Sequence, residues 1–240
     1  MPGAIPDRLD QVRERGVLRV GTTMDTPVFS MRDNAGNLHG FDMDALETLA
    51  PALGVRIEYV KMTFGSMLDD LAADKFDMAM SGMGRTYERA RTAAFSKPYM
   101  RYGKLLMIRA ADQDKYKSLA DLDKAGLKIA YNKGGLNDRF AHTEFKHAAP
   151  AGYPSNALAT ADLLAGKVDA QVQDSTAAVY LSRQNPQLAA MAPDNVFHPV
   201  HVAILMRRED VSLRAFIDLW IDQIEVDGTL AKIRARWLGP

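Results

Sequence analysis

Short apolar segments alternate with longer amphipathic ones along nearly the whole chain of 240 residues. Residues 17–22 alternate with period two, which is typical of a strand, and 55–62 form a second such segment. Between them, 41–53 carry apolar side chains at helical spacing, with Asp42 placed to cap this helix and Gly54 placed to end it. This strand–helix–strand order predicts an α/β fold with mostly parallel sheets and helices on both faces.

The same rhythm returns in the second half of the chain. Residues 127–132 and 168–173 are predicted strands, and 155–167 and 175–184 are predicted helices. No Pro/Gly-rich linker separates two consecutive domains, so we predict two α/β lobes with interleaved connectivity and two crossovers between them. The predicted lobe 1 comprises residues 1–103 and 202–240, and the predicted lobe 2 comprises residues 104–201.

Composition excludes several classes of protein. Thirty basic and thirty acidic side chains cancel, so no basic field exists to attract nucleic acid or an anionic membrane. No apolar run approaches the ~18 residues of a membrane-spanning helix, so no membrane insertion is expected. The first twenty residues lack the apolar core of a signal peptide, so either the protein is cytosolic or the chain is a mature form.

The sequence carries no signature of a metal or cofactor site. Its cysteine count is zero, which excludes disulfides, thiolate zinc sites and a cysteine nucleophile. The five histidines show no ligand spacing such as HExxH, and GxSxG, P-loop and GxGxxG motifs are absent. We therefore expect no metal, no cofactor and no catalytic residue of these types.

A glycine-rich turn follows one predicted strand, at the end of the sheet where α/β proteins bind ligands. It consists of Ser81, Gly82, Met83 and Gly84. Glycines let the backbone approach a ligand closely, and free amides at a helix start attract an anion. Arg89, in a short helical segment, can add the bidentate fork that suits a carboxylate. A plain tight turn with a solvated arginine is the alternative.

Two further strand ends carry polar or flexible residues. Residues 132–138 (NKGGLND) place Gly135 and its neighbouring glycine between a strand and a helix, where amides can bind an anion or merely make a turn. Asp174 follows the strand at 168–173 and can receive an ammonium group or cap the next helix. Phe64 is either a wall for a ligand or part of the core. Asp25 and Thr26 are polar residues after the first strand.

Five segments together resemble one known family, the polar-amino-acid class of periplasmic solute-binding proteins, which have the type II periplasmic-binding-protein fold. They are GVLRVGTTMDTPVFS, GFDMDALETLAPALG, FDMAMSGMGRTYERARTAAFSKPY, NKGGLNDRF and AGKVDAQVQDS. The resemblance spans nearly all of residues 9–240. It implies two α/β lobes that close on a small ligand, a periplasmic mature protein and an ABC transporter permease as partner.

The resemblance also implies roles for individual residues. In the family, the turn after this strand and an arginine at the place of Arg89 hold the α-carboxylate of the ligand. An aspartate at Asp174 takes the α-ammonium, and an aromatic at Phe64 covers the side chain. The predicted ligand-binding residues are Asp25, Thr26, Phe64, Ser81, Gly82, Met83, Gly84, Arg89, Lys104, Asn132, Gly135, Leu136 and Asp174.

Within the class, the sequence is most similar to the cyclohexadienyl dehydratase-like branch, which is enzymatic. The similarity lies in GTTMD, PYMRYGK and YNKGGLN, and Asp25, Lys104 and Asn132 fall on positions that matter in that branch. Its reaction on prephenate or arogenate needs a general acid to protonate the departing hydroxyl. The place of that acid is Ala177 here, and a methyl group donates no proton.

Other positions depart from ordinary amino-acid binders. The usual aromatic after the first strand is Thr26, and the expected hydroxyl residue after the second glycine pair is Leu136. We therefore predict a protein that binds a small carboxylate-bearing solute, an amino acid or related organic acid, in a cleft between two lobes. The alternative is a prephenate or arogenate dehydratase, a carbon–oxygen lyase, and a sensor lobe of a receptor is a third possibility.

Overall fold

The computed structural model describes residues 7–239, which form two compact units. Unit 1 contains the chain up to Met24, Phe29–Met100 and the chain from His201 onwards, and unit 2 contains Asp25–Val28 and Arg101–Val200. The boundaries predicted from the sequence lie between residues 103 and 104 and between residues 201 and 202. The prediction also assigns Asp25–Val28 to lobe 1. Residues 1–6 and 240 of the predicted lobe 1 lie outside the described residues.

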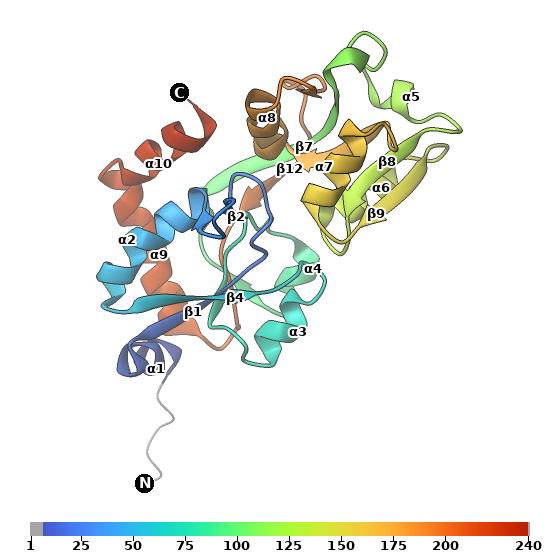
Figure 1. Cartoon of the computed structure of the whole chain (residues 1–240). Helices are drawn as coiled ribbons and strands as arrows, with labels where there is room; N and C mark the ends of the chain where they lie inside the picture. Colours follow the sequence, from blue (N-terminus) through green and yellow to red (C-terminus); the bar gives the residue numbers. More distant parts are fainter. Residues whose placement is uncertain (1–6, 240) are drawn as a thin grey trace. The chain divides into compact units, whose positions relative to one another are not determined.

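Unit 1 is built on a five-stranded sheet in the order β4–β1–β5–β13–β6, and Figure 1 labels β1 and β4 of this sheet. Its strands are β1 (Val17–Thr22), β4 (Arg56–Lys61), β5 (Met78–Ala79), β6 (Ala94–Phe95) and β13 (Leu205–Met206). β1 is parallel to β4 and β5, as strand–helix–strand connections require. β13 is antiparallel to β5 and β6, and it enters the sheet after the chain has returned from unit 2.

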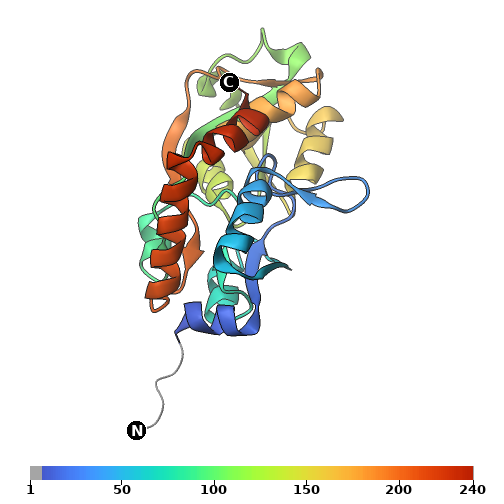
Figure 2. The same ribbon diagram turned by 90° about the vertical axis from the view of Figure 1, so that its left-hand side faces the viewer.

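The helices of unit 1 are α1 (Arg8–Arg15), α2 (Phe41–Leu53), α3 (Met67–Ala72), α4 (Tyr87–Ala90), α9 (Val211–Val226) and α10 (Thr229–Leu238). Figure 2 shows α9, α10 and α2 on one side of this unit. Hydrogen bonds from two indole groups fasten the C-terminal helices to α2: Trp220 donates to Thr48 over 3.0 Å and Trp237 donates to Asp44 over 2.8 Å. A small hairpin, β2 (Met31–Arg32) and β3 (Leu38–His39), precedes α2.

Unit 2 contains a second mixed sheet in the order β11–β7–β10–β8–β9, with β12 pairing with β7. Its strands are β7 (Met100–Arg109), β8 (Lys128–Asn132), β9 (Ala149–Tyr153), β10 (Ala170–Asp174), β11 (Leu188–Ala190) and β12 (Phe197–Val202). β8 is parallel to β9 and β10, whereas β7 is antiparallel to β10 and β11. The antiparallel pairing sets Lys104 of β7 opposite Asp174 of β10.

The helices of unit 2 are the 3-10 helix η1 (Ala110–Asp112), α5 (Leu119–Leu122), α6 (Leu136–Glu144), α7 (Asn156–Leu164) and α8 (Ser175–Gln184). The side chains of Leu106, Ile129, Phe140 and Val172 form part of its main core. Phe140 on α6 and Val172 on β10 thus bury the apolar faces that the sequence pattern predicts.

The predicted fold class is confirmed: each unit has parallel strand pairs and helices packed on its sheet, as in the type II periplasmic-binding-protein fold. One local prediction is wrong. Asp42 does not cap α2, because Gly40 occupies the N-cap position and Asp42 is buried one position inside the helix. Gly54 ends this helix as predicted, with a φ of 73°.

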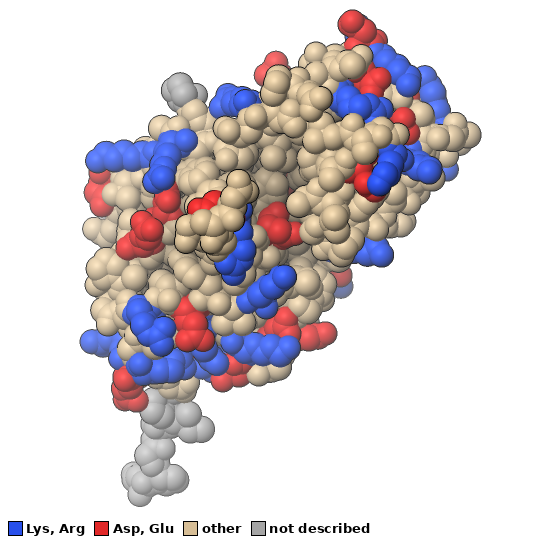
Figure 3. Space-filling view, in the orientation of Figure 1, with Lys and Arg blue, Asp and Glu red and all other residues tan. Residues whose placement is uncertain are grey.

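The surface carries both signs of charge side by side on the face that Figure 3 presents. This pattern agrees with a chain in which thirty basic and thirty acidic side chains balance. Of the helices between residues 7 and 239, none combines the length and hydropathy needed to cross a membrane.

Candidate functional site

Ser81 lies two residues after β5, where its hydroxyl group joins a buried cluster of hydroxyl side chains. Its Oγ lies 2.8 Å from Ser30 Oγ and 2.9 Å from Thr23 Oγ1, and it accepts a hydrogen bond from the Thr23 N–H over 3.3 Å. The Ser81 side chain is wholly excluded from solvent. These bonds fix the glycine-rich turn to the end of β1.

Gly82 takes a conformation that only glycine adopts easily, with a φ of +62°. A Cβ atom here would lie 2.5 Å from the Phe29 ring, so the ring closes the space beside the backbone. The Gly82 N–H donates to Asp42 Oδ2 over 2.7 Å, and Tyr99 donates to Asp42 Oδ1 over 2.8 Å. Asp42 therefore sets the orientation of the predicted anion-binding turn.

The environment of Asp42 changes its acidity. Complete burial raises the pKa of this carboxyl from 3.8 to about 7, against the hydrogen bonds from Tyr99 and Gly82, which lower the pKa. The carboxyl group thus exchanges its proton near neutral pH, directly beneath the turn.

Arg89, Gly84 and Phe64 meet in unit 1, and we refer to them as the Arg89 group. The Arg89 side chain is buried, with the residue 8% exposed, so the alternative of a solvated arginine is wrong. Its Nη1 donates to the Gly84 carbonyl over 2.9 Å, and its guanidinium carbon lies 6.0 Å from the centre of the Phe64 ring. Thr86 caps α4 by accepting from the Arg89 N–H, which fixes the backbone of the arginine.

Neighbours of the Arg89 group belong to the scaffold of unit 1. Met83 is buried among core residues that include Phe76 and Leu205, and its carbonyl accepts from the Ala203 N–H. Gly84 forms an isolated antiparallel bridge with Val202. The turn is consequently held on both sides by backbone hydrogen bonds.

A second group of polar side chains, the Lys104 network, lies in unit 2 and consists of Lys104, Asn132, Asn137 and Asp174. Lys104 Nζ forms an ion pair with Asp174 Oδ1 and donates to Asn137 Oδ1 over 2.7 Å. Asn137 Nδ2 then donates to Asn132 Oδ1 over 2.7 Å. The Lys104 ammonium also lies 5.1 Å from the centre of the Tyr102 ring.

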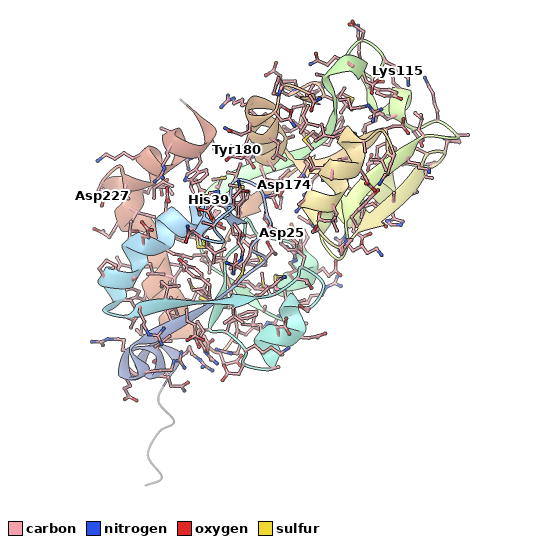
Figure 4. The ribbon with its side chains drawn as sticks, viewed as in Figure 1. Asp25, His39, Lys115, Asp174, Tyr180 and Asp227 are labelled. Carbon is pink, nitrogen blue, oxygen red and sulfur yellow. The ribbon has the colours of Figure 1, made fainter. Side chains whose placement is uncertain are left out.

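Asp174 lies at the end of β10, where α8 begins, and Tyr180 lies further along that helix (Figure 4). Although Asp174 occupies the N-cap position of α8, its side chain makes no capping hydrogen bond. The alternative of a helix-capping side chain is therefore wrong, and the carboxylate is directed to Lys104 instead.

Gly135 and Leu136 lie at the start of α6, beside the Lys104 network. Gly135 is the N-cap residue with extended backbone and no capping side chain, and Leu136 is the first helical residue. Both are partly exposed. The preceding Gly134 has a φ of 84°, and its N–H donates to Asp138 Oδ2 over 2.8 Å. The glycine pair thus makes a turn whose shape is set by the helix that follows.

Asp25 and Thr26 lie between two residues with left-handed backbone, Met24 (φ 62°) and Val28 (φ 72°). Such a conformation is strained for any side chain and most of all for a β-branched valine. Thr26 is buried and Asp25 is partly buried. Strained backbone of this kind is concentrated at functional segments of proteins. The strain therefore supports Asp25 and Thr26 as candidates for ligand binding.

The sequence pattern missed Asn137, Tyr99 and the true role of Asp42. Asn137 was within reach of prediction, since it follows the glycine pair in the first turn of α6. Tyr99 and Asp42 lie 57 residues apart, and no local pattern signals their hydrogen bond. Among residues 7–239, no group of three or more His, Cys, Asp or Glu side chains is arranged to hold a metal ion.

Comparisons with known proteins place the chain in a family of solute-binding proteins. Residues 18–240 match the bacterial extracellular solute-binding proteins, family 3. The chain is 35% identical over 231 residues to cyclohexadienyl dehydratase of Pseudomonas aeruginosa, covering 96% of this chain and 86% of that protein. It is 25% identical over 224 residues to ABC transporter arginine-binding protein 1 of Escherichia coli, covering 92% of this chain and 90% of that protein.

A solved structure shows the same fold. The crystal structure of the ancestral amino acid-binding protein AncCDT-1, described as a precursor of cyclohexadienyl dehydratase, matches with a TM-score of 0.91 at 33% identity. The match covers 96% of this chain and 99% of that one. Two α/β units, each discontinuous in sequence and each with its own mixed sheet, are the architecture of a type II periplasmic binding protein. The chain belongs to the bacterial extracellular solute-binding proteins, family 3.

Proposed function

We propose that this protein binds a small carboxylate-bearing solute, an amino acid or a related organic acid, as the solute-binding component of an ABC transporter. The observation that carries the proposal is the Arg89 group, a buried guanidinium fixed beside a glycine-rich turn. A guanidinium has five N–H donors in a planar fork, so Arg89 can hold both the Gly84 carbonyl and a carboxylate.

Membership of an extracellular solute-binding family supports this function. The E. coli relative is an arginine-binding protein of an ABC transporter, and AncCDT-1 is an amino acid-binding protein. An α-carboxylate is the group that their ligands share with the class of solute proposed here. We extend the proposal to a periplasmic location and to a transporter permease as the partner that receives the solute.

Removal of the Arg89 guanidinium tests the proposal. A thermal-shift screen against amino acids, 2-oxo acids and prephenate identifies a ligand, and calorimetry then measures its dissociation constant. Arg89→Ala should weaken binding by about 2–5 kcal/mol, because the buried carboxylate loses its charged partner. Arg91→Ala is the matched control, since Arg91 is exposed two residues further along and should leave binding unchanged. An unchanged dissociation constant in Arg89→Ala would refute the role.

A second candidate function is decarboxylative dehydration of prephenate or arogenate. The 35% identity to cyclohexadienyl dehydratase favours it, and the family resemblance implies that Lys104 and Asn132 fall on positions that matter in that branch. Ala177 argues against it: the residue is buried, with 1% exposed, and offers only a methyl group where the branch carries its acid. An absorbance assay for phenylpyruvate decides between them, and turnover that disappears in Asp174→Asn would favour the enzyme.

A further inference from the structure

The arrangement of the Lys104 network bears on which carboxylates the protein accepts. Lys104 and Asp174 are opposite each other on the antiparallel strands β7 and β10, so their side chains lie on the same face of the sheet. Both side chains are nearly excluded from water, at 4% and 10% exposure. The register of two strands therefore builds an ion pair at the position where the family resemblance implies an ammonium-binding aspartate.

Further contacts hold the lysine in place. Asn137 accepts from the Lys104 ammonium through Oδ1, and an ammonium can only donate, so the orientation of the Asn137 amide is fixed. Its Nδ2 must then donate to Asn132 Oδ1. The Tyr102 ring lies against the ammonium from another direction. Displacement of Lys104 from Asp174 would disturb all of these contacts together.

We propose that the protein selects carboxylates that lack an α-ammonium group, such as 2-oxo or 2-hydroxy acids, over the corresponding α-amino acids, because Lys104 occupies the carboxylate of Asp174. The inference rests on the proposed function of binding a carboxylate-bearing solute. It makes Lys104 the residue that determines specificity at the second carbon of the ligand.

Charge explains the selection. The ammonium of an amino acid would bring a second cation to a carboxylate that Lys104 already neutralises, in a place with little water to screen the repulsion. A 2-oxo or 2-hydroxy oxygen adds no charge and can accept a hydrogen bond. Asn132 uses its carbonyl oxygen within the network, so hydrogen-bond donation is the function left to its side chain, which suits such an oxygen.

Matched pairs of ligands test the selection on the full chain without any substitution. Calorimetry compares phenylpyruvate with L-phenylalanine, 2-oxoglutarate with L-glutamate, and 4-methyl-2-oxovalerate with L-leucine, together with the 2-hydroxy acids. We expect the oxo or hydroxy acid of at least one pair to bind tenfold or more tightly than its amino acid. An amino acid that binds as tightly as its analogue, or more tightly, overturns the inference but leaves the proposed function standing. Failure of every carboxylate to bind overturns both.

Two substitutions locate the cause of the selection. Lys104→Met releases Asp174, so the preference should shift at least tenfold toward the amino acid of the pair. Asp174→Asn keeps the positive charge of Lys104 and removes the carboxylate of residue 174, so the oxo acid should bind at least as tightly as before and amino acids should stay excluded. The inference would be overturned by two results together: Asp174→Asn no longer binds amino acids, and Lys104→Met does not shift the preference. Those results would show that Asp174 receives the ammonium group of the ligand.

Controls separate specificity from folding. Lys117→Met removes an exposed lysine of unit 2, with a side chain 69% exposed, and should leave every affinity ratio unchanged. Thermal unfolding reports whether each variant is folded. If Lys104→Met does not fold, Asp174→Asn and the ratios of the unsubstituted chain still decide the inference, since neither requires a buried carboxylate without a partner.

Discussion

Asp42 has its carboxyl group wholly buried between the Gly82 amide and the Tyr99 hydroxyl. Burial raises the pKa of this group from 3.8 to about 7. A carboxyl group that keeps its proton in the folded protein but loses it in the unfolded chain makes stability depend on pH. The position of Gly82 in the predicted anion-binding turn brings this dependence close to the candidate site.

The sign of the effect follows from the raised pKa. Below pH 4 both states are protonated and the full contribution of Asp42 is present. Between about pH 4 and pH 7 only the unfolded state ionises, so the free energy of unfolding falls as pH rises, by at most about 4 kcal/mol for three pKa units. Denaturant unfolding across pH 4–8 measures this slope. Asp42→Asn should remove the decline, and an identical pH profile in that variant would count against the assignment.

Gly82 gives a second test at single-residue scale. Gly82→Ala adds a Cβ 2.5 Å from the Phe29 ring to a backbone with positive φ, so we expect a loss of stability above about 3 kcal/mol. Gly16→Ala is a matched control, since Gly16 has a φ of +67° and open space around the added atom. The control should cost about 1–2 kcal/mol. If chemical denaturation gives equal losses of stability for Gly82→Ala and Gly16→Ala, the Phe29 ring moves aside to make room for the added Cβ.

Helix α1 shows how charge fastens an element to the fold. Asp77, at the start of β5 and wholly buried, accepts from Arg15 on α1 and from Arg19 on β1, and Arg8 of α1 lies 3.3 Å away. A carboxylate shared by three guanidinium groups holds the helix against the ends of two strands. An isolated surface ion pair contributes far less, because water screens it.

The contrast between the buried carboxylate of Asp77 and an exposed ion pair predicts that substitution at the two places lowers stability by different amounts. Asp77→Asn should lower the free energy of unfolding by about 1.5–3 kcal/mol, because it removes a wholly buried carboxylate that three partly buried guanidinium groups share, although Arg8 and Arg19 keep Asp74 as a counter-ion. Glu58→Gln is the control: it removes the partner of Arg56, 3.7 Å away, where both side chains are at least half exposed, and should change stability by no more than ~0.5 kcal/mol. Urea titration of both variants measures the difference. A small loss in Asp77→Asn would contradict the role of Asp77.

Elements with strong local patterns were predictable. The bounds of α2 and β1 agree with the prediction because apolar spacing, period-two alternation and Gly54 all act within a few residues. β12 (Phe197–Val202) was missed because it contains Pro199 and mostly exposed side chains, so no apolar alternation marks it. The apolar segment 201–208 contains the end of β12 and the short β13, which belong to different sheets.

At the scale of the whole molecule, pairings between distant segments account for what the sequence could not show. Lys104 and Asp174 are 70 residues apart, and only the β7–β10 register brings them together. The sequence identified both as candidates but left the role of Asp174 open between ammonium binding and helix capping. The prediction that Arg89 lies in a short helical segment is confirmed, whereas its burial against Phe64 depends on the packed core of unit 1.

The last prediction concerns both units together. The sequence predicts that one solute contacts both lobes, and a solute that does so stabilises both against unfolding, whereas a solute held by one unit stabilises that unit alone. At 100-fold its dissociation constant, a ligand adds about 2.7 kcal/mol, which should raise the melting temperature of a chain of 240 residues by roughly 5–10 °C. Scanning calorimetry resolves whether all of the unfolding heat moves together or only part of it. If one solute contacts both units, Arg89→Ala should reduce the shift of both together, to less than about 1 kcal/mol, because a loss of affinity of about 2–5 kcal/mol leaves little of the site occupied at the same ligand concentration. A residual shift in that variant, confined to one transition, would show that unit 2 binds the solute by itself.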